Sequence, residues 1–405
     1  MDILQKAKAL EKELIKDRRY LHSHAETGFN LRDTLDYVQK RLKEMGYEPQ
    51  VYGKGAIVAT LGQGRKNFLL RADMDALPIK EETGEAFACK NGKMHACGHD
   101  MHTAMLLGAA SLLKSRERQL SGKVTLLFQP AEEILEGAKN AIEAGVLKDY
   151  KAQAAMMLHV MTGVPFSAGT VIVASEGVSA PAADYFTVKV QGKGCHGSMP
   201  WKGKDALTVA ARILLGLQEI SARELALSQP AVLTVGALKT GEAGNAISDM
   251  AELYGTLRAF DEETRAYIKK RVQAIARGIA KAFETTVSVR FPSGCPTLVN
   301  DGELSAFAFK KLKELCGEKS VFTSAQLQGE GKKNGGGSED FAYISHEVPS
   351  VMIAIAAGET EKGYRYPLHH PKAKFDEGAL CVGAAAYAQI AEEWLNQVSI
   401  IQTRF

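Results

Sequence analysis

The chain has 405 residues, of which 45% are hydrophobic and 24% are charged, and its formal net charge is +3. This length predicts two domains, and the small net charge argues against a protein that binds nucleic acid. No apolar run reaches the roughly 18 residues that a membrane span needs, so we expect no membrane partner. The six cysteines are scattered, and the N-terminal segment is typical of an amphipathic helix, which together favour a cytoplasmic protein.

The first part of the chain has the pattern of two helices followed by two strands. Apolar residues recur at helical spacing over residues 2–46, with a break at HAETGFN. AIVATLG (56–62) and NFLLRADMDALP (67–78) have the composition of buried strands, and the second one ends abruptly in Asp73 and Asp75. Carboxylates at the end of a buried strand often build a site at the carboxyl edge of a sheet. Caps for a loop are an equal alternative here.

Helices and strands alternate between residues 103 and 160. TAMLLGAASLLKS (103–115) predicts an apolar helix, and KVTLLFQP (123–130) and AAMMLHV (154–160) predict buried strands. Glu132 and Glu133 follow the first of these strands, and His159 lies near the end of the second. The alternation predicts a mostly parallel sheet with helices on both faces, in which right-handed crossovers bring the strand ends to one edge.

A cluster of metal-type side chains, MHACGHDMH (94–102), lies between these elements. Thiolate and imidazole are ligands that zinc and its first-row neighbours prefer. Cys97 and His99 flank Gly98, where a bend could aim both side chains at one point. Together with the three strand ends, four separate segments thus bring metal-type side chains into one neighbourhood.

The pattern changes near residue 183. Strand, helix, strand, strand, helix, strand follow between residues 184 and 291, which is the order of a ferredoxin-like unit. The earlier pattern then returns, with LHHP (368–371) between the last strand and the last helix. We therefore predict an α/β fold whose mostly parallel mixed-sheet catalytic domain, residues 1–183 and 297–405, has helices on both faces. A ferredoxin-like α+β domain, residues 184–296, is inserted into it as a lid or dimerisation domain.

Nine motifs occur in the order seen in the amidohydrolase branch of the aminoacylase/carboxypeptidase-type metallopeptidases, which includes hippurate hydrolase, indole-acetyl-amino-acid hydrolases and aminobenzoyl-glutamate hydrolases. They are RADMDALP, MHACGHDMH, FQPAEE, LHV, GKGCHGSMP, GNAISD, GTLRAFD, GGGSEDF and LHHP. The resemblance covers nearly the whole chain. It implies a binuclear metal site with five ligands: Cys97, His99, Glu133, His159 and His369.

The resemblance also implies details of this site. Position within LHHP favours His369 over His370 as the ligand, and the Cys97 thiolate is a candidate bridge between the two metals. In relatives with a His-x-Asp motif, the histidine of this motif is a metal ligand, and Asp73 occupies its position in this chain. The coordination of each metal is therefore left open by the sequence. Asp75 resembles the aspartate that orients a metal-bound histidine.

The inserted domain contributes further candidates. His196 resembles the residue that polarises the scissile carbonyl, either as part of a lid or from a partner subunit. Asn245 and Arg258 resemble the groups that hold the substrate carboxylate, for which a guanidinium is well suited, although a surface arginine is the alternative for Arg258. The family often forms dimers, and we expect a homodimer through the inserted domain.

These residues, together with the resemblance, predict a metal-dependent amidohydrolase, and the resemblance implies that it cleaves N-acyl or N-aroyl amino acids. Metal ions lower the pKa of a bound water to about 7 and so supply hydroxide as the nucleophile. Glu133 binds metal, and Glu132 takes the proton of the water and passes it to the leaving amine as general base and acid. A helix N-terminus is the structural alternative for the glutamate pair. We expect two divalent ions per subunit, Zn or Mn before Co or Ni, because the mixed ligand set accepts several metals.

Three alternatives remain open from the sequence. A carboxypeptidase or dipeptidase that acts on short peptides is the nearest one. A hydrolase with Cys97 as its nucleophile and His99 as its base would leave the carboxylates without a task, and the pair is badly spaced for it. A binding protein without catalysis would not need Glu132 beside a full ligand set.

Overall fold

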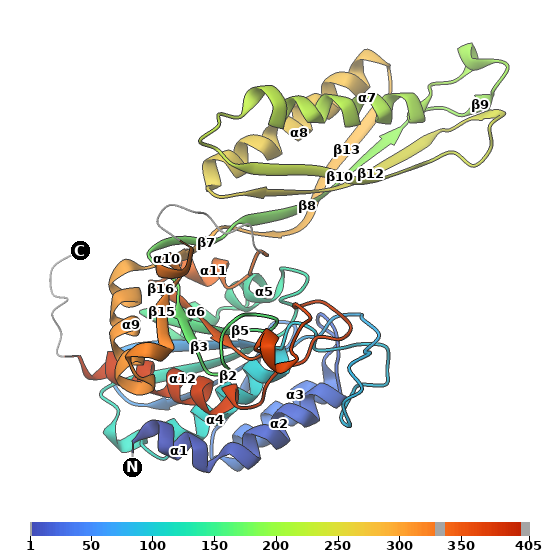
Figure 1. The fold of residues 1–405 in the computed structure, drawn as a ribbon. Helices are drawn as coiled ribbons and strands as arrows, with labels where there is room; N and C mark the ends of the chain where they lie inside the picture. Colours follow the sequence, from blue (N-terminus) through green and yellow to red (C-terminus); the bar gives the residue numbers. More distant parts are fainter. Residues whose placement is uncertain (1, 329–336, 398–405) are drawn as a thin grey trace. The chain divides into compact units, whose positions relative to one another are not determined.

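The computed structural model describes residues 2–328 and 337–397, and these form two compact units. The larger unit contains residues 2–179, 299–328 and 340–397, and the inserted unit contains residues 180–298 and 337–339. Figure 1 shows the fold of each unit. Gly335 and Gly336 of the GGGSEDF motif lie outside the described residues.

A mixed sheet forms the centre of the larger unit. In the part of the chain that the structure describes, it has eight strands in the order β1 (Gln50–Tyr52), β2 (Ala56–Gly62), β4 (Lys123–Gln129), β3 (Asn67–Asp73), β5 (Ala154–Met161), β16 (Ser350–Ala356), β6 (Val171–Val173) and β15 (Val321–Thr323). The four central strands, β4, β3, β5 and β16, run parallel to one another, whereas β2 and β6 are antiparallel to their inner neighbours. The carboxyl ends of the central strands therefore meet at one edge.

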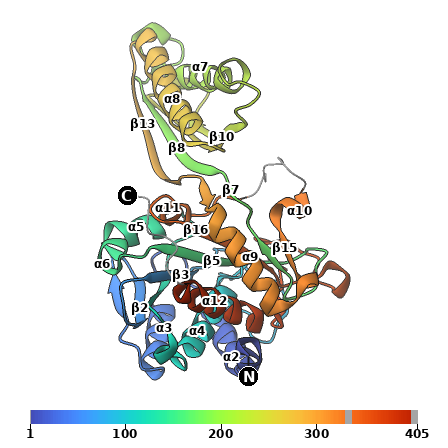
Figure 2. The same ribbon diagram turned by 90° about the vertical axis from the view of Figure 1, so that its left-hand side faces the viewer.

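Helices cover both faces of this sheet (Figure 2). One face is covered by α5 (Gly137–Glu143), α6 (Val146–Tyr150) and α11 (Ala342–Ser345). The other face carries a thicker layer: α4 (His99–Lys114), α9 (Gly302–Cys316) and α12 (Ala379–Asn396), with α1 (Ile3–Ala9), α2 (Glu11–Ser23) and α3 (Arg32–Glu44) outside them. The short helix α10 (Ser324–Gln328) follows β15. The predicted α/β class with helices on both faces is confirmed.

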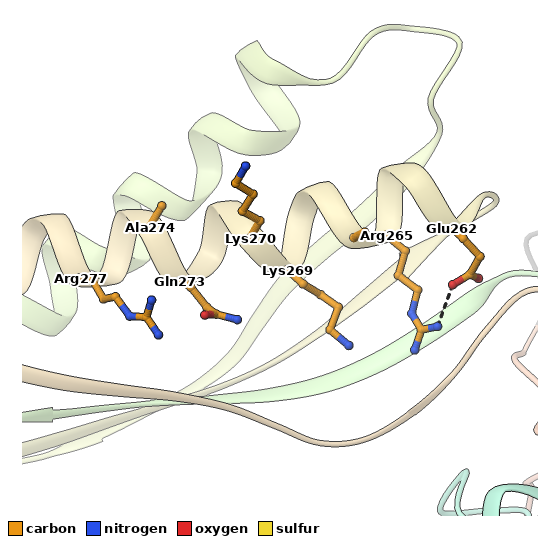
Figure 3. Close-up of a pocket in the computed structure, with 8 residues that line it drawn as sticks. Glu262, Arg265, Lys269, Lys270, Gln273, Ala274 and Arg277 are labelled. Carbon is orange, nitrogen blue, oxygen red and sulfur yellow. Dashed lines mark hydrogen bonds and ion pairs between the residues drawn. The ribbon is translucent and has the colours of Figure 1, made fainter.

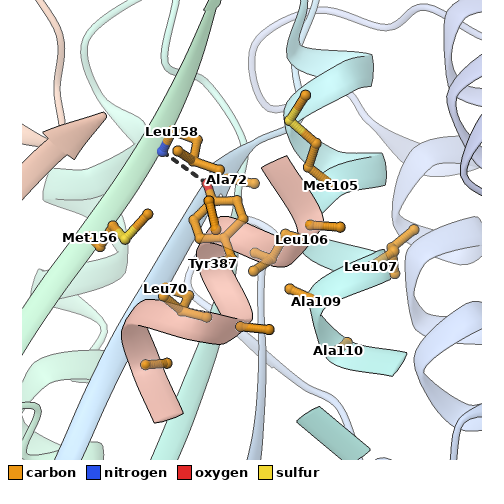
Figure 4. Packing of buried hydrophobic residues seen from close by; sticks show 14 of the residues in the cluster. Leu70, Ala72, Met105, Leu106, Leu107, Ala109, Ala110, Met156, Leu158 and Tyr387 are labelled. Carbon is orange, nitrogen blue, oxygen red and sulfur yellow. Dashed lines mark hydrogen bonds between the residues drawn. The ribbon is translucent and has the colours of Figure 1, made fainter. Parts of the chain in front are cut away.

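Helix α4 is apolar on nearly all sides because it packs between the sheet and the helices α2 and α12. Its residues Met105, Leu106, Leu107, Ala109 and Ala110 belong to one buried cluster with Leu70 of β3 and Met156 of β5 (Figure 4). The first turn of α4, which begins with His99, is thus anchored in the main core. The sequence pattern places the start of this helix at residue 103, but it begins four residues earlier, at His99.

The inserted unit contains an antiparallel sheet in the order β10 (Ala231–Thr240), β12 (Met250–Ala259), β8 (Ala182–Gln191) and β13 (Thr286–Cys295). Its helices α7 (Ala206–Glu219) and α8 (Glu262–Ala282) bury apolar side chains against this sheet. The chain order and strand order are those of the predicted ferredoxin-like unit. Two small sheets complete the fold: β9 (Cys195–His196) with β11 (Ala246–Ile247), and β7 (Gly177–Ala180) with β14 (Leu298–Asn300). Among the described helices, none combines the length and the apolar composition needed to cross a membrane.

Candidate metal centre

The carboxyl edge of the large sheet brings together side chains from four segments of the sequence. Asp73 ends β3, Glu132 and Glu133 follow β4, and His159 lies near the end of β5. His99 begins α4, which packs against β3 and β5. The convergence expected from the order of strands and helices is therefore present in the larger unit.

A turn at Gly98 directs Cys97 and His99 into this edge. Gly98 has a φ of 84°, in the left-handed region that favours glycine, and it is the N-cap residue of α4. Cys97 Sγ lies 3.5 Å from His159 Nε2 and 3.3 Å from His369 Nε2. One sulfur atom thus stands between two imidazoles from distant parts of the chain.

His99 presents one ring nitrogen to a group of carboxylates. Its Nδ1 donates to the main-chain carbonyl of Asp75 at 2.7 Å, which directs Nε2 into the site. Nε2 is buried without a hydrogen-bond partner, 3.9 Å from Glu132 Oε2 and 3.8 Å from Glu133 Oε1. Glu133 Oε1 is likewise buried without a hydrogen-bond partner. Buried polar atoms of this kind are rare unless a ligand or ion satisfies them, so the pair fits a metal ion.

The pKa shifts of Glu133 and Cys97 also fit a site for a metal ion. Burial and the nearby carboxylates of Asp75 and Asp73 raise the pKa of Glu133 to about 7, although His99 acts in the opposite sense. Burial, together with the charge of Glu133, raises the pKa of the Cys97 thiol well above its ordinary value. A divalent cation reverses both effects, because it stabilises the carboxylate and the thiolate as ligands.

All five ligands predicted from the sequence lie in this centre. Each belongs to a group of three side chains whose donor atoms lie within 4.8 Å of one another. Three of these groups are Cys97, His99 and His159; Cys97, Glu133 and His369; and His99, Glu132 and Glu133. His99 also belongs to a further group, with Asp73 and His102. Because the first two share the sulfur atom, the arrangement suits two neighbouring metal ions with a bridging thiolate.

His369 belongs to this centre and His370 does not. His369 has a φ of 64°, and its main-chain N–H donates to Ala96 O at 2.9 Å, which ties its loop to the Cys97 segment. Its Nε2 lies 3.5 Å from Glu133 Oε1. The His370 ring instead stacks on Tyr366, with ring centroids 4.4 Å apart.

Asp75 holds the two glutamates through their main chain. Its Oδ1 accepts from the Glu132 N–H at 2.9 Å and its Oδ2 from the Glu133 N–H at 3.3 Å. The same loop contains Ala131 and Leu135 with φ values of 60° and 56°, a strained conformation for residues other than glycine. The histidine-orienting contact expected of Asp75 is made by its carbonyl, and its carboxylate fixes the loop of Glu132 and Glu133.

Asp73 and His102 form a further group of possible ligands with His99, but both are engaged in hydrogen bonds of their own. Asp73 accepts from Arg71 Nη1 at 2.7 Å and from His102 Nδ1 at 2.6 Å. His102 Nε2 accepts from the Val160 N–H at 2.8 Å, so both of its ring nitrogens are occupied. Burial lowers the pKa of His102 to about 4, which keeps the ring neutral. Sequence reasoning assigned neither Arg71 nor His102 a role, although an arginine within an apolar strand is a visible signal.

The substrate-binding candidates of the inserted unit fall into two places. His196 on β9 pairs with Ala246 on β11, and the Gly197 N–H donates to Asn245 O at 2.7 Å, so His196 and Asn245 are neighbours. Arg258 lies near the opposite end of β12, where its Nη1 donates to Leu257 O at 2.9 Å. Arg258 is eight positions along the extended strand from Met250 at the other end, which corresponds to about 26 Å.

A groove of 630 Å³ runs along α8 of the inserted unit (Figure 3). Its charged lining is mostly basic, and it contains none of the residues predicted to bind metal or substrate. Asp184 accepts from two of its cations, Arg265 at 2.6 Å and Lys269 at 2.8 Å. This groove is therefore separate from the chemistry of the metal centre.

Comparisons with known proteins agree with this geometry. Residues 69–393 match the family model "Peptidase family M20/M25/M40". The chain is 34% identical to N-acetylcysteine deacetylase of Bacillus subtilis over 95% of this chain and 97% of that protein. It is also 34% identical to hippurate hydrolase of Campylobacter jejuni, over 98% of this chain and all of that protein.

A solved structure from Bacillus subtilis, described as a dinuclear metal binding peptidase from the M20 family, is 31% identical, with a TM-score of 0.75. The match covers 96% of this chain and 100% of that one. The family resemblance inferred from the nine motifs is thereby confirmed. The chain belongs to peptidase family M20/M25/M40.

Proposed function

We propose that the protein hydrolyses the amide bond of N-acyl or N-aroyl amino acids with the help of two divalent metal ions. The observation that carries this proposal is the convergence of Cys97, His99, Glu133, His159 and His369 beside Glu132. Relatives that cleave N-acetylcysteine and hippurate support the same class of substrate. When bound, the two ions activate a water molecule and polarise the amide carbonyl.

Glu132 is the general base and acid in this proposal. It is 6% exposed, and its main-chain N–H is fixed by the carboxylate of Asp75. From this position its carboxylate takes a proton from the attacking water and delivers it to the nitrogen of the leaving amine. Glu133, whose main chain is fixed by the same aspartate, is a ligand.

The donor set suggests which ions the centre accepts. One thiolate, three imidazoles and a carboxylate form a mixed set that suits zinc or manganese, with cobalt or nickel as substitutes. All six cysteines are free, which fits the reducing cytoplasm that we propose as the location of the protein.

We also propose a homodimer in which each inserted unit serves the site of its partner. One small substrate cannot contact both ends of β12, so Arg258 and the pair His196 and Asn245 cannot act on the same molecule within one inserted unit. The outer surface of α7 and the edge strand β10 expose apolar side chains that suit a second copy of this chain. These are Leu207, Leu215, Val232 and Leu238.

Amine release from a panel of N-acyl amino acids tests the function. Hippurate, N-acetyl and indole-acetyl conjugates and a dipeptide are offered to chelated protein, and again after Mn²⁺ or Zn²⁺ is added. We expect activity that disappears with chelation and returns with metal. Glu132→Gln should retain metal and fold but lose at least about 100-fold in kcat, because proton transfer typically contributes 10²–10⁴-fold. Activity on dipeptides alone would favour a peptidase, and an unchanged Glu132→Gln variant would refute the assigned base.

Mixed dimers test the exchange between subunits. Glu132→Gln and His196→Ala are each expected to be inactive alone, because one lacks the base and the other lacks the histidine. After the two variants are mixed and allowed to exchange subunits, the site of the His196→Ala subunit receives His196 from its partner. Recovered activity supports the exchange, whereas a mixture that stays inactive while light scattering shows hybrid dimers contradicts it.

A further inference from the structure

The strands β3 and β5 separate at the edge where the metal centre lies. Their parallel pairing runs from Phe68 opposite Ala154 to Arg71 opposite Met157 and ends there. On its other side, β5 remains paired with β16 as far as Met161. The part of β5 that carries His159 therefore has one continuous neighbour and one neighbour that has moved away.

Two buried side chains bridge the gap between these strands. The Tyr387 hydroxyl of α12 accepts from the Leu158 N–H at 3.0 Å (Figure 4). The same hydroxyl donates to Arg71 O at 2.5 Å. One step further, His102 Nε2 accepts from the Val160 N–H at 2.8 Å, and its Nδ1 donates to Asp73 Oδ1 at 2.6 Å.

The spacing of these contacts follows the geometry of a β-strand. Leu158 and Val160 are two residues apart, so their N–H groups point to the same side of β5, toward β3. Where the regular ladder would join the two strands directly, each bridge inserts a side chain between them. Both side chains are fully buried, so water does not compete for these main-chain groups.

The two bridges connect the strand that carries His159 with the strand whose end holds His99 and Glu133. His159 belongs to β5, and its Nδ1 donates to Val160 O at 2.7 Å, so the Val160 residue is held by His102 at its nitrogen and by His159 at its oxygen. His99 and Glu133 are instead held by Asp75, which follows β3. The distance between β3 and β5 thus determines how far His159 stands from the other ligands.

We infer that His102 and Tyr387 are positioning residues that hold β3 and β5 apart and thereby set the spacing of the metal ligands. His102 does not bind metal itself, because both of its nitrogens are engaged, although its place in the MHACGHDMH motif resembles that of a ligand. This inference rests on the metal site of the proposed function, but it concerns metal affinity and needs no substrate.

Metal affinity of the folded protein tests the inference. Dissociation constants for Zn²⁺ are measured by competition with a chelator, and the absorption spectrum of the Co²⁺ form reports the ligand geometry. His102→Leu removes one bridge and should weaken binding of metal by about 10- to 100-fold, the range seen when groups that orient ligands are lost. His102→Gln should recover part of the affinity, because its amide can both donate to Asp73 and accept from Val160.

Tyr387→Phe is the milder second variant, since it removes only the bridging hydroxyl. Tyr47→Phe is its matched control, because Tyr47 is also buried in the larger unit and its hydroxyl donates to Ala110 O at 2.9 Å, away from the metal centre. We expect Tyr387→Phe to weaken Zn²⁺ binding several-fold and shift the Co²⁺ spectrum, and Tyr47→Phe to lower only the stability.

Two outcomes would overturn the inference. In the first, His102→Leu and Tyr387→Phe lose stability like Tyr47→Phe but bind Zn²⁺ with the affinity of the unmodified protein. In the second, His102→Leu does not fold and Tyr387→Phe leaves the affinity and the Co²⁺ spectrum unchanged. An unmodified protein that binds two ions but cleaves no N-acyl amino acid would refute the proposed function and leave this test intact.

Discussion

Replacing Gly98 by alanine perturbs the metal centre at the turn between Cys97 and His99. A Cβ atom at this position would lie 2.3 Å from Val160 Cγ2, closer than Cβ atoms in proteins approach their neighbours, and in a tight contact of 3.0 Å with Phe375 Cε1. The φ of 84° adds a conformational penalty for any residue with a Cβ atom. Because Val160 is next to His159, the clash acts directly on the segment of a proposed ligand.

The size of the effect follows from these two contributions. A left-handed conformation costs an alanine about 1–2 kcal/mol relative to glycine. Forcing an extra carbon into a packed site costs about 1–3 kcal/mol more. We therefore expect Gly98→Ala to lower the free energy of unfolding by about 2–5 kcal/mol and to reduce metal content, because Cys97 and His99 change direction.

Gly92→Ala is a matched control. Gly92 has a φ of 83°, but a Cβ atom there would meet nothing within 4 Å, so only the conformational penalty of about 1–2 kcal/mol applies. Urea unfolding is followed by tryptophan fluorescence in a Trp201→Phe background, in which Trp394 of the larger unit is the single tryptophan. Equal free energies of unfolding and equal metal contents for the two variants would refute the steric argument.

Two further predictions concern the stability of the fold rather than the geometry of the proposed ligands. His22 donates to Asp100 at 2.9 Å and to Glu81 at 3.1 Å. Burial alone would lower the pKa of His22, but the two carboxylates outweigh burial, and the pKa of His22 is raised. A histidine with a raised pKa stabilises the fold fully below its ordinary pKa of about 6.5, and this stabilisation is lost as the pH rises through the pKa of the folded state. We therefore expect His22→Ala to lower the free energy of unfolding by about 3 kcal/mol at pH 6 and by less at pH 9. If urea unfolding shows that His22→Ala lowers the free energy of unfolding by the same amount at both pH values, the predicted role of His22 is wrong. Asp261→Ala removes the N-cap of α8, where Asp261 accepts from the Thr264 N–H at 2.7 Å, and should destabilise the inserted unit by about 1 kcal/mol with unchanged metal content.

Much of the fold could be predicted from the sequence because its signals are local. β2 covers residues 56–62 as its apolar run predicted, and the first turn of α4 was missed because the metal-type residues His99, Asp100 and His102 hide the helical pattern there. The antiparallel direction of β2 against β4 depends on pairing across the sheet, which the periodicity of a single strand does not specify.

The candidate site could be predicted in part for a similar reason. Strand ends and crossover handedness bring Glu133 and His159 together without any knowledge of side-chain positions. The task of His102 could not be inferred, because its spacing from His99 equals that of a second ligand on the same helix face. Only the partners of its two nitrogens, Asp73 and Val160, distinguish it from a ligand. The separation of Arg258 from His196 likewise depends on strand register.

The place of β16 in the sheet has a consequence for the biosynthesis of the protein. This strand lies between β5 and β6, although more than 170 residues of sequence separate it from either one. The centre of the sheet therefore stays open on the ribosome while the whole inserted unit emerges, and His369 emerges later still. Since domains fold as units during synthesis, the inserted unit can fold before the larger one closes. In the proposed metal site, the complete ligand set therefore becomes available only after the inserted unit has been synthesised.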